Sequence, residues 1–328
     1  MKQKIIIGLS VVLLLAAVYL IVSDLFRSSP ASDEVSCCGD DLTKMKKIDT
    51  VRVGYTRVKC IDTGLKGLSG ISIVPGGNIV VCGNRQLAIF SAGGEMFKQI
   101  NLDSALTSVA VTAERIYAGM ESRVIVFDSE GNNRVSWTPY HNQSYITSIA
   151  VSDSRVFVAD ARNKKVLQYT PEGALSQVIG EKNTLKGNPG FVIPSMYFDV
   201  AFGAFGELWV VNPGRLSLVN YNSKGNMQSS WGKASFSDDG FTGCCNPAHM
   251  AVLPDGSFVT YEKGTDRIKV FNPAGQFITY VGGAGSFRGD ADFHTGNLNL
   301  VKDMAVNAQG DVYILDLYNQ INIFRKKR

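Results

Sequence analysis

Short runs in which apolar residues alternate with polar ones recur along most of the chain, and each run ends at a turn signal. The clearest copy lies in residues 248–283. Its strands are expected at Met250–Val252, Phe258–Tyr261, Arg267–Phe271 and Gln276–Val281, separated by a Pro-Asp-Gly turn, a polar turn and an Asn-Pro-Ala-Gly turn. Four short strands with period-two alternation and Gly/Pro turns predict one blade of a β-propeller.

A small residue in the first strand marks each further copy. These positions are Ser72, Ala110, Ala150, Ala201, Ala251 and Ala305. Ten or eleven residues later a second mark follows: Gly83, Met120, Asp160, Asn212, Glu262 and Asp316. An aromatic residue then opens a turn that closes on glycine: Phe90/Gly94, Phe127/Gly131, Tyr169/Gly173, Tyr221/Gly225 and Phe271/Gly275. The fixed spacing predicts an all-β, six-bladed β-propeller that forms one domain over residues 51–328.

The two ends of this domain are expected to pair. Residues Val51–Ile61 form a strand without a blade of its own, while the last copy, Lys302–Phe324, has only three strands. We expect the N-terminal strand to supply the missing fourth one, because closure of the ring removes the open sheet edges.

The N-terminus predicts a membrane segment. Ile5–Val22 is an apolar run that follows a basic start, long enough to cross a bilayer as a helix. We expect residues 1–23 to be an uncleaved signal-anchor helix and residues 24–50 a polar tether; a cleaved signal peptide is the alternative, although Ser29-Pro30-Ala31 is an awkward cleavage site. The lysines before the run place the propeller outside the cytoplasm, on the periplasmic or extracellular side, or secreted if the signal is cleaved.

Composition limits the partners. The 328 residues carry a net charge of +4, are 45% hydrophobic and include 33 glycines, which suits a turn-rich globule. The charge is too small for a nucleic-acid surface, so we expect no nucleic-acid partner and read the basic run Arg325–Arg328 as a solvated tail.

Three connections between blades are longer than the others. They are Glu181–Ser195, Lys233–Pro247 and Ala284–Val301, each between the fourth strand of one blade and the first strand of the next. Equivalent connections emerge on one face of a propeller, so this face is where we expect a protein or small-molecule ligand to bind.

The repeat resembles the NHL repeat. The segments AVLPDGSFVTYEKGTDRIKVFNPAGQF, AVNAQGDVYILDLYNQINIF and AVSDSRVFVADARNKKVLQYTPEGAL carry the likeness, which extends over roughly residues 50–325. Gly83, Met120 and Asn212 depart from it, because the repeat usually has Asp there. The resemblance implies a six-bladed propeller that serves as a binding platform or, occasionally, as a lyase or lactonase.

Both enzymatic branches can be tested on the residues. The positions that match the zinc-binding histidines of peptidyl-amidating lyases are Ser69, Ala248 and Lys302, and none of them is a histidine. His249 lies one residue away, on the opposite side of a strand, so the zinc-lyase interpretation fails on ligand identity. Asp160, Asn212, Glu262 and Asp316 are expected to satisfy the N–H groups of turns, with a lactonase-like divalent-metal site as the minor alternative.

Two cysteine doublets are the main local oddity. Cys37-Cys38 lies in the tether and Cys244-Cys245 in a long loop, and in an exported protein we expect disulfides between or within them. Alternatively, Cys244, Cys245 and His249, with His294, form a thiolate site that binds a soft metal or exchanges electrons. Cys60 and Cys82 lie within strands and are expected to be buried.

We therefore predict a membrane-anchored binding or scaffold module, with a metal- or thiol-dependent enzyme or redox protein as the alternative. No catalytic signature such as GxSxG or a P-loop occurs, so catalysis and cofactor stay open, a divalent metal included. The expected ligand-binding face consists of the residues Cys244, Cys245, His249, Glu262, Arg288, Asp292 and His294.

Overall fold

A computed structural model describes residues 47–132, 134–183, 188–287 and 299–328. The chain divides into two units, residues 1–44 and 45–328, and only the second is described. The predicted membrane segment, most of the tether and Cys37-Cys38 lie outside the described residues. Within the described ranges no helix is long and apolar enough to span a membrane.

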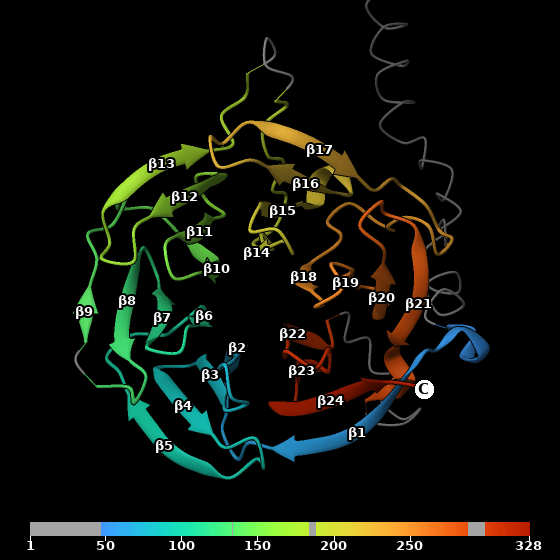
Figure 1. The fold of residues 1–328 in the computed structure, drawn as a ribbon, viewed down its shortest axis with the longest axis horizontal. Coiled ribbons are helices and arrows are strands. Elements are labelled where there is room, and N and C mark those ends of the chain that lie inside the picture. Colours follow the sequence, from blue (N-terminus) through green and yellow to red (C-terminus); the bar gives the residue numbers. More distant parts are fainter. Residues whose placement is uncertain (1–46, 133, 184–187, 288–298) are drawn as a thin grey trace, which may run out of the picture. The chain divides into compact units, whose positions relative to one another are not determined.

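The described residues of the second unit form six four-stranded antiparallel sheets arranged as blades around an axis, which confirms the predicted six-bladed β-propeller (Figure 1). The first three blades consist of β2 (Leu68–Ile73), β3 (Ile79–Gly83), β4 (Gln86–Phe90) and β5 (Met96–Asn101); β6 (Ser108–Val111), β7 (Arg115–Met120), β8 (Arg123–Asp128) and β9 (Val135–Ser136); and β10 (Ile146–Val151), β11 (Val156–Asp160), β12 (Lys165–Tyr169) and β13 (Leu175–Ile179).

The next two blades repeat this order, and the sixth combines both ends of the unit. They consist of β14 (Val200–Phe202), β15 (Leu208–Asn212), β16 (Ser217–Tyr221) and β17 (Met227–Trp231); β18 (His249–Val252), β19 (Phe258–Glu262), β20 (Arg267–Phe271) and β21 (Phe277–Gly282); and β22 (Val301–Val306), β23 (Val312–Asp316), β24 (Gln320–Lys326) and β1 (Tyr55–Asp62).

The ring closes as the sequence predicted. β1 pairs with β24 in antiparallel register through seven residue pairs, from Tyr55 opposite Lys326 to Asp62 opposite Gln320. β24 extends to Lys326 because its backbone pairs with Tyr55 and Thr56 of β1. The residues of the basic run Arg325–Arg328 are exposed, as expected, and Arg325 also makes a bidentate ion pair with Asp311 at 2.9 and 2.7 Å.

The core consists of six apolar clusters, each between two neighbouring blades. As a result the second strands are buried on both faces, for example β11 and β19, and the period-two alternation predicted for all four strands fails there. Outer strands keep exposed positions. Cys82 on β3 is buried as predicted, whereas Cys60 is exposed because β1 is an outermost strand.

Two faces follow from the strand order. Each innermost strand starts at a connection from the previous blade and ends at the turn to its second strand. We call the side with the long connections the loop face; its described parts are residues 180–183, 188–199, 232–248, 283–287 and 299–300. We call the opposite side, with residues 74–78, 112–114, 152–155, 203–207, 253–257 and 307–311, the turn face.

Candidate functional site

The marked residues at the ends of second strands hold the connections of the loop face in place. Asp160 Oδ1 accepts hydrogen bonds from the backbone N–H groups of Tyr145 and Asn163 at 3.1 and 3.2 Å, and Asp316 Oδ1 accepts from those of Tyr318 and Gln320, both at 2.9 Å. This is the turn-capping role expected for these side chains.

Glu262 has a similar role for the loop that enters the fifth blade. Its carboxylate is fully buried; Oε1 accepts from the Thr242 N–H at 2.7 Å, and Oε2 lies 2.8 Å from Lys269 Nζ. Lys269 is fully buried too, which lowers its pKa, and its ammonium donates to the Asp238 and Gly240 carbonyls. The first half of the loop therefore packs against β20 and β21 of the fifth blade. Glu262 therefore braces the loop from the interior of the blade.

The second half of the same loop does lie on the loop face. Asn246 Nδ2 donates to the Thr242 carbonyl at 2.7 Å and to the Lys263 carbonyl at 3.1 Å, and Asn246 Oδ1 accepts from the Lys263 N–H at 2.9 Å. These bonds fix the backbone on both sides of Cys244 and Cys245. The backbone that carries the two cysteines is therefore held in one conformation by hydrogen bonds.

Cys244 is exposed and Cys245 is buried beneath it, with their sulfurs 3.2 Å apart. No disulfide joins them: both are free thiols in the structure, so the disulfide predicted within this doublet is not formed. Burial alone would raise the pKa of Cys245, but hydrogen bonds from Cys244 and Ser195 and the nearby Lys263 ammonium outweigh it and lower that pKa. The hydrogen bond to Cys245 raises the pKa of Cys244, so of the two sulfurs Cys245 is the one whose thiolate form is favoured.

Lys263 connects this doublet to the neighbouring connection. Its ammonium lies 3.4 Å from Ser195 Oγ and 4.7 Å from the centre of the Tyr197 ring. We call Ser195, Tyr197, Cys244, Cys245 and Lys263 the thiol cluster. The predicted residues Arg288, Asp292 and His294 belong to residues 288–298 and lie outside the described residues.

His249 lies on the other side of Tyr197, at the start of the innermost strand β18. Its ring meets the Tyr197 ring edge-on, with centroids 5.6 Å apart, and its Nδ1 is 3.9 Å from Asp199 and 3.8 Å from Asp303. Burial, with a smaller contribution from the Lys302 charge, lowers the pKa of His249 to about 4. The imidazole is therefore neutral at neutral pH.

The structure distributes the predicted site residues over three places. Within the described chain no hydrogen bond or ion pair connects Cys244, His249 and Glu262 with one another. They belong to the thiol cluster, the start of the innermost strand β18 and the interior of the fifth blade. Nor do the described residues contain a group of three or more His, Cys, Asp or Glu side chains arranged to hold a metal ion. The described residues Cys244, His249 and Glu262 therefore do not converge in one pocket, and His294 lies outside the described residues.

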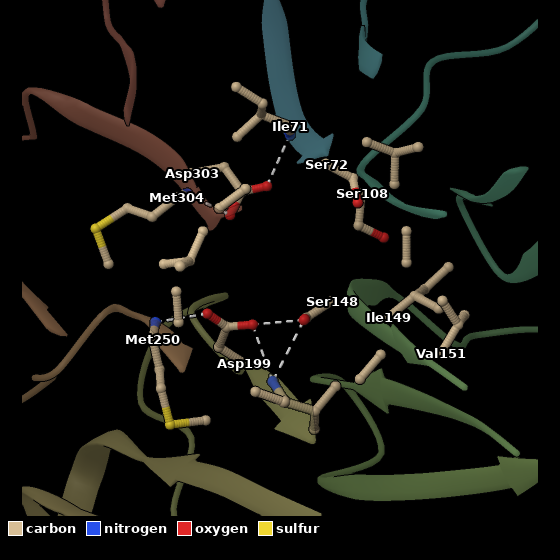
Figure 2. Close-up of a pocket in the computed structure, with 18 of the residues that line it drawn as sticks. Ile71, Ser72, Ser108, Ser148, Ile149, Val151, Asp199, Met250, Asp303 and Met304 are labelled. Carbon is tan, nitrogen blue, oxygen red and sulfur yellow. Dashed lines mark hydrogen bonds between the residues drawn. The ribbon is translucent and has the colours of Figure 1, made fainter. Parts of the chain in front are cut away.

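Sequence reasoning missed Asp199 and Asp303. Both line the central channel together with Ser108 and Ser148 (Figure 2). They stand two positions before the small residues that mark the repeat, and this position carries no shared residue type from blade to blade. In each blade this position holds one of Gly70, Ser108, Ser148, Asp199, His249 and Asp303.

Comparison with known proteins fixes the fold alone. No protein-family model matches the chain, and no curated protein matches it. Among solved structures it is similar to a streptogramin B lyase, with a TM-score of 0.58 and 11% identity over 83% of this chain and 97% of that one. It is similar to virginiamycin B lyase from Staphylococcus aureus with a TM-score of 0.58 and 10% identity over 83% of this chain and 100% of that one. It is also similar to the WD40 β-propeller domain of Doa1, with a TM-score of 0.54 and 9% identity over 84% of this chain and 98% of that one. The chain is thus a six-bladed β-propeller, and the NHL-type repeat stays a prediction.

Proposed function

We propose that this chain is an NHL-type propeller that is anchored in a membrane through residues 5–22 and binds a protein or small-molecule ligand on its loop face, outside the cytoplasm. The apolar run and the lysines before it support the anchor and its orientation. The spacing of the repeat marks supports the NHL-type assignment.

One observation carries the binding proposal: connections on the loop face are held by buried side chains yet leave apolar groups uncovered. Val192 donates its N–H to Asn212 Oδ1 at 2.9 Å and accepts from the Gly214 N–H at 2.9 Å. In spite of this bracing, its side chain is 39% exposed and that of Met196 is 49% exposed. Pre-organised loops with exposed apolar side chains are suited to binding, because little conformational entropy is lost on association.

Site-specific photo-crosslinking tests this proposal. We expect the full chain with p-benzoylphenylalanine in place of Val192 or Met196 to form adducts of discrete mass in cells, and to do so in the membrane fraction. Phe205, which is 96% exposed in a turn of the turn face, provides the matched control position and should give none. Equal adducts at all three positions, no adducts at positions 192 and 196, or recovery of the chain from the cytosol would contradict the proposal.

The thiol cluster favours a second candidate function, thiol-dependent chemistry on the same face. The observation is the Sγ–Sγ distance of 3.2 Å beside the Lys263 ammonium, which favours a thiolate on the doublet. A dithiol of this kind binds soft metals and exchanges with disulfides.

Lys263→Met should slow alkylation of the doublet by iodoacetamide at pH 7 by roughly two- to tenfold, because the thiolate loses its cationic neighbour. Intact-mass spectrometry gives the alkylation rate, and the variants Cys244→Ser and Cys245→Ser show which of the two sulfurs reacts. Lys233→Met removes an exposed lysine of the same loop and should leave the rate unchanged. Equal rates in the Lys263→Met variant and the unmodified chain would rule out the thiolate.

A further inference from the structure

The two cysteines of the thiol cluster differ in their access to solvent. Cys244 is exposed, whereas Cys245 beneath it is only 7% exposed, and their sulfurs lie 3.2 Å apart. The hydrogen bonds of Asn246 hold the backbone that carries both residues. A molecule that approaches the loop face therefore meets the sulfur of Cys244 before that of Cys245.

The groups around the doublet favour negative charge on the buried sulfur. Although burial opposes it, Cys244, Ser195 and Lys263 together lower the pKa of Cys245. The Lys263 ammonium is held near the doublet, since its Nζ lies 3.4 Å from Ser195 Oγ and 4.7 Å from the centre of the Tyr197 ring. Among the described residues no carboxylate forms an ion pair with Lys263, so its charge is available to a thiolate on Cys245.

A bond between the two sulfurs would be strained. The peptide bond between Cys244 and Cys245 is trans, so their Cα atoms are about 3.8 Å apart. Ordinary disulfides join Cα atoms that are about 4.4–6.8 Å apart, and departures from that geometry make the bond easier to reduce. A disulfide within the doublet would therefore be a reactive disulfide rather than a structural one.

We propose that the doublet is a thiol-oxidising centre, whose oxidised form is a Cys244–Cys245 disulfide and whose substrate is a pair of thiols in a polypeptide. The free thiols in the structure are its reduced form. The centre rests on the thiol-dependent function proposed above. The connection that supplies Ser195 also carries the exposed side chains of Val192 and Met196, so a polypeptide bound there would lie beside Cys244.

The access and charge of the two sulfurs assign their roles in the exchange. A thiolate of the substrate attacks the exposed Cys244 sulfur, and the Cys244–Cys245 bond breaks. Its electron pair goes to Cys245, which leaves as the thiolate that Ser195 and Lys263 stabilise. The second substrate thiol then attacks the substrate sulfur of the mixed disulfide, and Cys244 leaves and takes up the proton of that thiol. The substrate gains a disulfide, the doublet gains two electrons, and the proton of the first substrate thiol goes to solvent.

A low-molecular-weight disulfide such as oxidised glutathione returns the doublet to its oxidised form. Cys244 attacks one sulfur of this disulfide and releases one thiol. Cys245, whose sulfur is 3.2 Å away, then attacks Cys244 and releases the second thiol. The two electrons of the doublet thereby pass to the small disulfide.

Reaction with oxidised glutathione tests whether the internal disulfide forms. The full chain carries Cys37→Ser and Cys38→Ser, so that the tether doublet does not react. We expect peptide mass spectrometry to show loss of two hydrogens at Cys244 and Cys245, whereas Cys60, an exposed single cysteine on β1, should keep a glutathione adduct. In a Cys245→Ser variant Cys244 should keep its adduct too. A lasting adduct on Cys244 of the chain that retains Cys245 would overturn the proposal, as would a doublet that stays reduced while Cys60 reacts.

The oxidised chain tests the direction of the exchange. A synthetic peptide with two reduced cysteines should be oxidised by the doublet at least about tenfold faster than by oxidised glutathione at equal concentration, because the internal disulfide is strained. Acid quenching during the reaction should trap the peptide on Cys244. A rate no faster than that of oxidised glutathione, or equal trapping on Cys244 and Cys245, would contradict the assigned roles.

Lys263→Met separates the oxidising centre from the thiolate proposed above. In the oxidised chain this substitution should slow reduction by the peptide roughly two- to tenfold, because the leaving thiolate loses its cation. Lys233→Met should leave the rate unchanged. If alkylation of the reduced doublet depends on Lys263 but no internal disulfide forms, the thiolate stands and the oxidising centre is wrong. If the disulfide forms but Lys263→Met changes neither rate, Cys245 is not the leaving sulfur that the proposal requires.

Discussion

Replacing Lys269 by methionine should destabilise the propeller by about 3–5 kcal/mol, because it leaves the Glu262 carboxylate buried without its cation. Both side chains are fully buried, and their charged atoms lie 2.8 Å apart. The substitution also removes the donor to the Asp238 and Gly240 carbonyls, which holds the first half of the loop against the blade. Urea unfolding followed by circular dichroism measures the loss, and proteolysis should cleave the loop first.

A matched control separates burial from charge. Lys233 pairs with Asp239 in the same loop at 2.5 Å, but the side chains are 61% and 52% exposed, so Lys233→Met should cost less than about 1 kcal/mol. Adding Glu262→Gln to Lys269→Met should recover part of the loss, because a neutral amide is cheaper to bury and its oxygen still accepts from Thr242. If the Lys269→Met variant is as stable as the Lys233→Met variant, the buried ion pair is not the source of the predicted loss of stability.

The framework could be predicted from the sequence because its marks recur along the chain. The small residue of the first strand occurs in six blades, the aromatic-to-glycine turn in five and a polar residue at the end of the second strand in four. Gly173 and Gly275 show why the turn needs glycine: both have positive φ, 94° and 78°, and a Cβ there would meet Trp137 or Trp231 at 2.6 to 2.7 Å. This turn recurs in five of the six blades and is visible without a structure.

The site was harder to predict because its residues depend on contacts that a repeat does not specify. Lys269 has the alternating pattern of a half-exposed strand, yet the inserted loop covers it completely. Asp199 and Asp303 interact across blades about a common axis, so neither has a local signal beyond its position in the repeat. Lys263 lies in the turn after a second strand. It belongs to the thiol cluster only because the hydrogen bond from its N–H to Asn246 brings the cysteine doublet beside it.

Removing the first strand should have a larger effect than any single substitution. A chain that begins at residue 63 should not unfold cooperatively, whereas one that begins at residue 47 should. β1 buries Tyr55 and Ile61, worth about 1.5–3 kcal/mol each, and its loss leaves the edge of β24 unpaired along seven residue pairs. These losses together approach the 5–15 kcal/mol that stabilises a typical domain.

Restoring the strand in trans distinguishes ring closure from a general effect of truncation. A peptide of residues 47–62 should bind the shortened chain and restore a cooperative thermal transition, because the register from Tyr55 to Asp62 is fixed by pairing with β24. A peptide with Tyr55→Ala and Ile61→Ala keeps the backbone donors and acceptors but lacks the two buried side chains, so it should restore much less. If the chain from residue 63 melts at the same temperature as the chain from residue 47, the ring does not depend on this strand. If both peptides rescue equally, backbone pairing alone closes the ring and the apolar contacts of Tyr55 and Ile61 contribute little to it.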